Sequence, residues 1–319
     1  MTRHLRYSAA LLLLMGAPYA AAASLQSCRA IADDSQRLAC YDSLAGPPPA
    51  TPASVDRSAL PALSRRLESQ QAAQGNRFAI VPYKPNYILP LSYTSTRLDN
   101  PSYGFPPERS EVKFQISFQF SMLQGLLGSN TAFYAAYSQL SFWQAYNGKV
   151  SSPFRETDYE PEVGIGYRPP DLRLLGLDIP LLRLGFVHQS NGQGGLRSRS
   201  WNRIVGTMAF QRGNFAGALR VWKRVRLTSA DDNPDITDYL GYGSLLLAYK
   251  LHEQTFALTL HDNLRWSANR GALQLDYSFP LTRRLKGYVQ YFNGYGESLI
   301  DYNRSINRLG IGIMLTDWL

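Results

Sequence analysis

Residues 112–121 read VKFQISFQFS, a segment in which every second side chain is apolar. The apolar members share one face of an extended chain: Val112, Phe114, Ile116, Phe118 and Phe120. The residues between them are Lys, Gln or Ser. Because side chains of a β-strand point alternately to its two faces, this period of two predicts a strand with one apolar and one polar face. A soluble sheet can show the same pattern, so the number and length of such segments must distinguish the two classes.

Similar segments follow along the rest of the chain. Strands are predicted at residues 87–95, 111–122, 131–144, 160–168, 182–190, 201–211, 215–227, 239–250, 255–265, 271–279, 285–296 and 307–319. Most are long enough to cross a bilayer at a tilt, and short turns mostly alternate with longer loops. The link through Pro169 and Pro170 is the exception, because it is longer than this alternation expects. The predicted fold is all-β, a twelve-stranded antiparallel transmembrane β-barrel.

Composition excludes several other classes of protein. The 319 residues are 45% hydrophobic and 18% charged, and no apolar run of about 18 residues follows the N-terminus, which excludes a bundle of membrane-spanning helices. Two cysteines exclude a disulfide-dense scaffold and a four-thiolate zinc site. The net charge is +9, but Lys and Arg are dispersed along the chain, so attraction to anionic lipid headgroups is a better interpretation than nucleic-acid binding.

The N-terminal region divides into a signal and an extension. Residues 1–23 combine Arg3 and Arg6 with an apolar stretch at 9–17 and small residues at 20–23, which predicts a secretory signal peptide. Residues 24–76 form a predicted periplasmic extension, with helical segments at 27–44 and 59–74 and a Pro-rich linker at 46–52. The barrel domain is predicted at residues 77–319, in the bacterial outer membrane.

The extension holds both cysteines of the chain, Cys28 and Cys40. In an oxidising periplasm their simplest fate is a disulfide, and closing a loop of about a dozen residues stabilises the fold by roughly 3 kcal/mol. The competing interpretation is a lipid-modified Cys28 in a lipoprotein-like run over residues 25–28. Gln26 is bulky for that role, and Cys40 would then have no partner.

One of the four histidines stands out by its position on a strand. Alternation places His188 and Ser190 on the apolar, lipid-facing side of their strand, and it places Asn202 on the same side of the next strand. Polar groups that face lipid are costly and usually have a functional reason. Ser190 is therefore a candidate nucleophile, His188 its candidate general base and Asn202 the candidate group that orients the imidazole. The alternative is that His188 and Ser190 only form a hydrogen bond at the rim of the barrel, without a catalytic role. The N–H of Gly192, with that of Ser190, is a candidate oxyanion donor.

The same residues lie in motifs that resemble the bacterial outer-membrane phospholipase A family. The matching blocks are residues 188–192 (HQSNG), 198–203 (SRSWNR), 151–157 (SSPFRET), 231–235 (DDNPD) and 294–303 (GYGESLIDYN). They keep the order and spacing of the family from about Phe78 to the C-terminus. The resemblance implies a twelve-stranded barrel that hydrolyses the acyl esters of phospholipids at both glycerol positions, uses a Ser–His–Asn triad, needs calcium and is active as a homodimer.

The resemblance also implies a set of calcium ligands at the dimer interface. They are the Ser198 hydroxyl, the main-chain carbonyl of Gln193 and Ser151 of the partner chain, with Asp232 as a further candidate. Oxygen ligands suit Ca²⁺. The chain departs from the family at Gln193, where Arg is usual, at Gly195, where some members carry an acid for a second calcium, and at Leu319, where an aromatic residue is common.

A different class of function is also compatible with a barrel, namely a non-catalytic outer-membrane channel or adhesin. That hypothesis predicts that His188, Ser190 and Asn202 are dispensable and that a wide lumen or large loops carry the function. About twelve strands enclose a narrow interior that inward side chains can fill, which disfavours a pore.

Overall fold

The computed structural model describes residues 25–45, 60–73, 76, 79–227 and 231–319. The chain forms two compact units, Met1–Arg57 and Ser58–Leu319. The expected signal peptide at 1–23 and Pro-rich linker at 46–52 lie outside the described residues. Within the described part, no helix combines the length and the apolar character that a membrane crossing requires.

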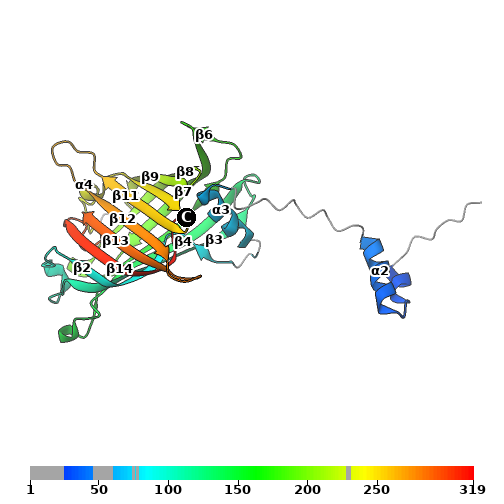
Figure 1. Ribbon diagram of the computed structural model, residues 1–319. Helices are drawn as coiled ribbons and strands as arrows, with labels where there is room; N and C mark the ends of the chain where they lie inside the picture. Colours follow the sequence, from blue (N-terminus) through cyan, green and yellow to red (C-terminus); the bar gives the residue numbers. More distant parts are fainter. Residues whose placement is uncertain (1–24, 46–59, 74–75, 77–78, 228–230) are drawn as a thin grey trace, which may run out of the picture. The chain divides into compact units, whose positions relative to one another are not determined.

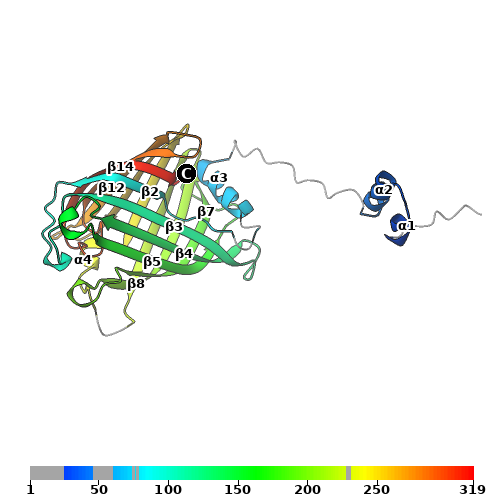
Figure 2. The ribbon, with the colours of Figure 1, turned by 90° about the horizontal axis from the view of Figure 1, so that it is seen from below.

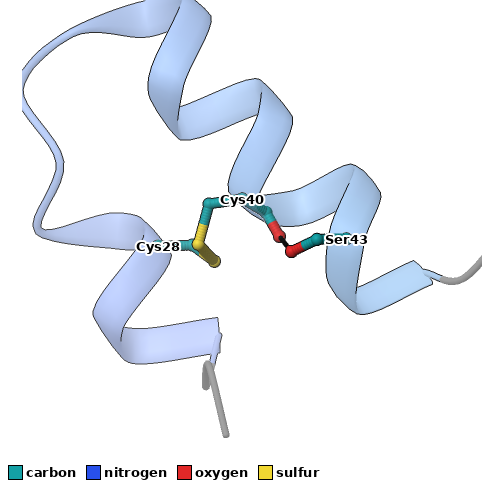
Figure 3. Close-up of a disulfide and its surroundings, with 3 residues drawn as sticks. All are labelled: Cys28, Cys40 and Ser43. Atoms are coloured by element: carbon teal, nitrogen blue, oxygen red, sulfur yellow. Dashed lines mark hydrogen bonds between the residues drawn. A yellow bond between two sulfur atoms is a disulfide. The ribbon is translucent and has the colours of Figure 1, made fainter. Parts of the chain in front are cut away.

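The first unit contains a helical hairpin closed by a disulfide between Cys28 and Cys40 (Figure 3). Its helices are α1 (Leu25–Arg29) and α2 (Asp34–Ala45), where the sequence predicted one helical segment at 27–44. The break arises because the Asp33 carboxylate accepts a hydrogen bond of 3.0 Å from the Gln36 N–H and so begins a new helix. The disulfide then joins the two helices.

The second unit is a closed barrel of twelve antiparallel strands, as predicted (Figures 1 and 2). Its strands are β2 (Asn86–Thr94), β3 (Ser110–Gln124), β4 (Thr131–Trp143), β5 (Phe154–Tyr167), β7 (Leu177–Ser190), β8 (Ser200–Arg212), β9 (Phe215–Val225), β10 (Gly243–Leu251), β11 (Gln254–Asp262), β12 (Gly271–Pro280), β13 (Lys286–Gly294) and β14 (Ile306–Thr316). Closure is complete because β2 pairs with β14 as well as with β3. A barrel leaves no unpaired sheet edge in the lipid.

Burial along β3 shows which face of the barrel meets lipid. Lys113 and Gln119 are at most 4% exposed, whereas Ile116 is 47% exposed. The polar face therefore points into the barrel and the apolar face points out, the reverse of a soluble protein. This is the arrangement that a transmembrane barrel requires, and it confirms the interpretation of residues 112–121.

Charged side chains fill the end of the barrel at which the long loops lie. Arg155 bridges Glu111 at 2.8 Å and Asp301 at 2.7 Å, and each of these side chains is at most 1% exposed. Lys113 pairs with Glu297 at 3.0 Å beside them. Asp301 and Glu297 belong to the connection between β13 and β14, so these ion pairs hold that connection inside the barrel mouth.

Helix α3 (Ala62–Ala73) packs at the opposite end of the barrel. The Ser64 N–H donates to the Gln211 side chain at 3.0 Å, and Arg66 donates to the carbonyl of Asp317 at 2.6 Å. The compact unit consequently begins at Ser58, whereas the sequence predicted a domain boundary at residue 77. The segment expected as part of the extension is thus held by the strand ends of the barrel.

The largest differences from the predicted strand boundaries are at the starts of β5, β7 and β10, and β7 begins at Leu177 instead of residue 182. β5 begins at Phe154 instead of residue 160, and a register shift interrupts the β4–β5 ladder at its first residues. β10 begins at Gly243 instead of residue 239, because residues 237–240 form the short helix α4 (Thr237–Leu240). The link through Pro169 and Pro170 is long because it includes the small strand β6 (Arg173–Leu174), which folds back on β7.

The remaining elements are short. They are β1 (Val81–Pro82), which pairs with β3, and the 3₁₀ turns η2 (Pro101–Tyr103), η3 (Gly148–Val150) and η4 (Gly195–Arg197).

Candidate active site on the outer face of the barrel

The candidate catalytic residues come from the adjacent strands β7 and β8. In the β7–β8 ladder His188 lies opposite Asn202, and Ser190 lies opposite Ser200. Their neighbours Val187 and Trp201 are at most 2% exposed and point into the barrel. By strand alternation His188, Ser190 and Asn202 therefore point outward, as the sequence predicted.

A hydrogen bond joins the imidazole to the amide. His188 Nδ1 lies 2.8 Å from Asn202 Oδ1. Because an amide oxygen only accepts, the contact places the ring proton on Nδ1 and leaves the lone pair of Nε2 free. Asn202 thus fixes the tautomer in which a general base is ready to take a proton from a neighbouring hydroxyl.

Ser190 lies two residues beyond His188 on the same face of β7, which corresponds to about 7 Å between the two Cα atoms. In the described part of the chain its hydroxyl makes no hydrogen bond, either to His188 or to another group. Catalytic hydrogen bonds are often formed only when substrate is bound. The structure therefore brings His188 and Asn202 into contact and leaves the Ser190 hydroxyl without a hydrogen bond to the described residues.

Gly192 follows Ser190 in a backbone conformation with a φ of 64°. A Cβ atom built on Gly192 would lie 3.2 Å from the ring of Tyr159, which stands next to Ser190 in the β5–β7 ladder. Both the left-handed φ and the close ring favour glycine at this position. Its N–H lies in the segment that follows the hydroxyl directly.

The calcium-ligand candidates are only partly brought together within one chain. The hydroxyls of Ser198 and Ser200 both donate to the carboxylate of Asp232, at 2.7 Å and 3.1 Å. Ser151 lies instead in the β4–β5 connection, where its side chain is exposed and makes no hydrogen bond to the described residues. Among the described residues, no three His, Cys, Asp or Glu side chains gather as a metal cluster.

The candidates outside this cluster have other positions. His261 lies in β11 and lines an interior cavity of about 210 Å³, and His252 lies in the tight turn before that strand, with a φ of 55°. Gln193 is exposed in the connection between β7 and β8, and Gly195 in that connection offers no acid for a second calcium.

Asn191 is a residue to which sequence reasoning gave no role. It lies between Ser190 and Gly192, yet it is only 2% exposed and its amide bonds to groups on both sides of the β7–β8 connection. A buried amide in a connection is an unusual feature, but its contact with Glu156, 35 residues away, cannot be found from the motif alone.

Comparisons with known proteins give a consistent result. A family described as Phospholipase A1 matches residues 63–315. Phospholipase A1 of Klebsiella pneumoniae and that of Escherichia coli K12 are each 40% identical to the chain over 248 residues, covering 76% of the chain and 84% and 83% of those proteins.

Two solved structures are also similar to the barrel. The Escherichia coli outer membrane phospholipase A is 38% identical, with a TM-score of 0.71, and the match covers 76% of this chain and all of that one, 100%. The Salmonella typhi outer membrane phospholipase dimer with bound calcium is 38% identical, with a TM-score of 0.72, and the match covers 78% of this chain and 96% of that one.

Proposed function

The chain belongs to the phospholipase A1 family and is an outer-membrane β-barrel enzyme, and on this basis we propose how it acts. It hydrolyses acyl esters of phospholipids with Ser190, His188 and Asn202 on the lipid-facing side of the barrel. The activity depends on calcium and on the pairing of two chains. The observation that carries the proposal is the 2.8 Å contact between His188 and Asn202 on a surface that otherwise faces hydrocarbon.

The position of the site suits a substrate that arrives from the membrane. Leu184, which shares the outward face of β7 with His188, is 56% exposed, so the outer surface below the site is apolar. A phospholipid in the outer leaflet can place its acyl chains against such a surface and its esters at the depth of the triad. The substrate does not need to pass into the barrel.

The proposed reaction gives each of the three side chains one task. Ser190 Oγ attacks the ester carbonyl while His188 Nε2 removes its proton, and the imidazolium then returns that proton to the departing lysolipid alcohol. A water molecule, deprotonated by His188, hydrolyses the acyl–Ser190 ester and restores the hydroxyl. Asn202 keeps the ring in one tautomer throughout, although a neutral amide stabilises the imidazolium less than a carboxylate would.

Charge develops on the carbonyl oxygen in both steps, and the Gly192 N–H is the proposed donor to it. The oxygen-only donor set near it fits calcium, since the Ser198 hydroxyl and the Asp232 carboxylate already meet at 2.7 Å. Ser198, the Gln193 carbonyl and Ser151 of a second chain would hold the ion, with Asp232 beside them. When bound, calcium supplies positive charge near the oxyanion.

A polar cluster on the outer face supports pairing of two chains. Gln139 donates to Ser141 at 3.0 Å and accepts from Tyr137 at 3.0 Å. By register Gln139 lies level with Tyr159, and Tyr159 lies level with Ser190. Polar groups in a lipid-facing band are costly unless another protein surface covers them. A second chain seated here would lie beside the triad, where its Ser151 can complete the calcium site.

The channel hypothesis has less support. The lumen is crossed by buried ion pairs at one end, and α3 packs against the strand ends at the other. The interior cavities next to α3 and to His261 measure only about 310 and 210 Å³.

A single substitution tests the proposed function. In purified, refolded protein with mixed phospholipid–detergent micelles, Ser190→Ala should lower ester hydrolysis by at least about 10³-fold. A calcium chelator should abolish the wild-type activity, and adding calcium back should restore it. Unchanged hydrolysis in Ser190→Ala would contradict the proposal and leave a non-catalytic barrel as the better interpretation. Ser129→Ala, in the β3–β4 turn, is the matched control for loss of an exposed hydroxyl.

A further inference from the structure

The side chain of Asn191 joins the two ends of the β7–β8 connection. Its Oδ1 accepts from the N–H of Arg199 at 3.0 Å and from the N–H of Gln193 at 3.3 Å. Its Nδ2 donates to the carbonyl of Arg197 at 2.8 Å and to Glu156 at 3.1 Å. Two donors and two acceptors are thus satisfied in a buried amide.

These contacts extend the β7–β8 ladder beyond its last strand pair, Ser190 and Ser200. The backbone N–H of Asn191 also donates to the carbonyl of Arg199 at 3.0 Å. Residues 192–198 therefore form a loop closed at its base. Gly192, Gln193 and Ser198 all belong to this loop, so the proposed oxyanion donor and two proposed calcium ligands have one common support.

Glu156 accepts from the Asn191 amide on the side away from the loop. Its carboxylate is 1% exposed and accepts both from Asn191 Nδ2 and, at 2.9 Å, from the N–H of Ile300. Because the backbone N–H groups of Arg199 and Gln193 can only donate, the amide oxygen must face the loop, and the amide nitrogen faces Glu156. The Ile300 contact fixes Glu156 in turn from the connection between β13 and β14.

We propose that Asn191 and Glu156 are positioning residues that hold the loop at 192–198 in the geometry needed for calcium binding and oxyanion stabilisation. This inference rests on the proposed function. Neither side chain touches substrate, and both act through the loop. Replacing a residue that hydrogen-bonds to metal ligands and orients them typically lowers metal affinity or activity by about 10–100-fold.

Reversing the donor and the acceptor of the Asn191–Glu156 hydrogen bond tests this contact directly. Asn191→Asp keeps the size of the side chain but turns its donor toward Glu156 into a second acceptor. We expect the calcium concentration for half-maximal activity to rise by about 10–100-fold, and kcat at saturating calcium to fall. Adding Glu156→Gln supplies a new donor opposite the carboxylate introduced at position 191, while the glutamine oxygen still accepts from Ile300. The double variant should therefore recover part of the lost calcium affinity, because the contact with Glu156 is restored but the one with the Arg197 carbonyl is not.

The matched control is Glu162→Gln on the same strand. Glu162 is also buried and faces the interior, but it accepts from Tyr83 at 2.9 Å and from Tyr134 at 2.5 Å and has no contact with the loop. Glu162→Gln in the Asn191→Asp background should give no recovery. A general effect of removing one buried negative charge would instead give equal recovery in both double variants and would overturn the proposal.

The remaining outcomes also separate the two proposals. Calcium-dependent hydrolysis in the wild type with unchanged calcium dependence in Asn191→Asp would refute the positioning role and leave the triad untouched. Absence of calcium-dependent hydrolysis in the wild type would refute the proposed function itself. If Asn191→Asp does not fold, Asn191→Ala, which leaves Glu156 with its Ile300 contact, should show the same loss of calcium affinity, and a normal calcium dependence would overturn the proposal.

Discussion

The hydroxyl of Ser198 donates a 2.7 Å hydrogen bond to the carboxylate of Asp232, which joins the β7–β8 connection to the connection after β9. Ser200 donates to the same carboxylate from the first residue of β8. Asp232 therefore holds negative charge directly beside a proposed calcium ligand.

Asp232→Asn should weaken calcium binding, because it removes that charge but keeps an oxygen that can accept from Ser198. The calcium concentration for half-maximal hydrolysis is expected to rise by about tenfold or more, with kcat at saturating calcium little changed. Calcium titration of activity measures both. An unaltered titration would show that Asp232 has no part in the calcium site. Asp171→Asn, at the opposite end of the barrel, is the control for a lost surface charge.

Two inactive variants should complement each other if Ser151 acts across a dimer. A Ser190→Ala chain retains Ser151, and a Ser151→Ala chain retains its own triad. A mixed dimer therefore contains one complete site. Equal mixing before reconstitution should restore about a quarter of the wild-type activity, since half of the dimers are mixed and each has one working site.

Each homogeneous preparation serves as the control for that mixture. Activity that remains at the sum of the two separate samples would mean that no site is shared between chains.

Gly192→Ala should reduce activity through the backbone and not through the triad. The left-handed φ of 64° and the Tyr159 ring at 3.2 Å both oppose a Cβ atom, and such strain costs about 1–3 kcal/mol. We expect kcat to fall by about 10–100-fold with little change in KM, because the displaced N–H is the proposed oxyanion donor and would act in the transition state. Gly194→Ala is the control, since Gly194 has a φ of −113° and open space around its Cβ position.

Low pH should destabilise the fold through Asp317, which lies directly after the last strand, β14. Burial alone would raise the pKa of Asp317, but the hydrogen bond and charge of Lys286 outweigh it, and the pKa lies below its usual value. Because the folded-state pKa is depressed, this contribution to stability is present above a pH of about 4 and is lost as the pH falls through the folded-state pKa.

Asp317→Asn should consequently lower the free energy of unfolding at pH 7 by about 2 kcal/mol. Urea unfolding of the wild type and the variant at neutral pH and at a pH below the folded-state pKa of Asp317 provides the measurement. The difference in the free energy of unfolding between wild type and variant should be smaller in acid. A difference that does not change with pH would show that the Asp317 charge is not involved.

The alternation of side chains along strands was sufficient to predict the barrel and the outward direction of His188, Ser190 and Asn202. That prediction succeeds because a strand has only two faces, so one residue of known direction determines the direction of the others. The hydrogen bond between His188 and Asn202 then depends only on the register of the β7–β8 hairpin. The sequence limits that register to a few residues, because it predicts where both strands meet the connection between them.

The supports behind the site could not be predicted in this way. Asn191 meets Glu156 from 35 residues away, and Glu156 meets Ile300 from 144 residues away. The alternation of side chains along one strand cannot predict a contact that forms only when the barrel has closed. The early start of β5 was missed for a related reason, since its inward residues Glu156 and Asp158 bind a connection from the far side of the barrel and not a neighbouring strand.

The outward direction of Ser190 also determines where the products go. On the proposed mechanism a fatty acid and a lysolipid leave sideways into the leaflet that supplied the substrate, because the filled lumen offers neither of them a route across. Both are surfactants, so each turnover loosens the lipid packing around the enzyme and eases the approach of the next substrate molecule. Hydrolysis would then accelerate itself locally, and restraint must come from keeping the chains apart.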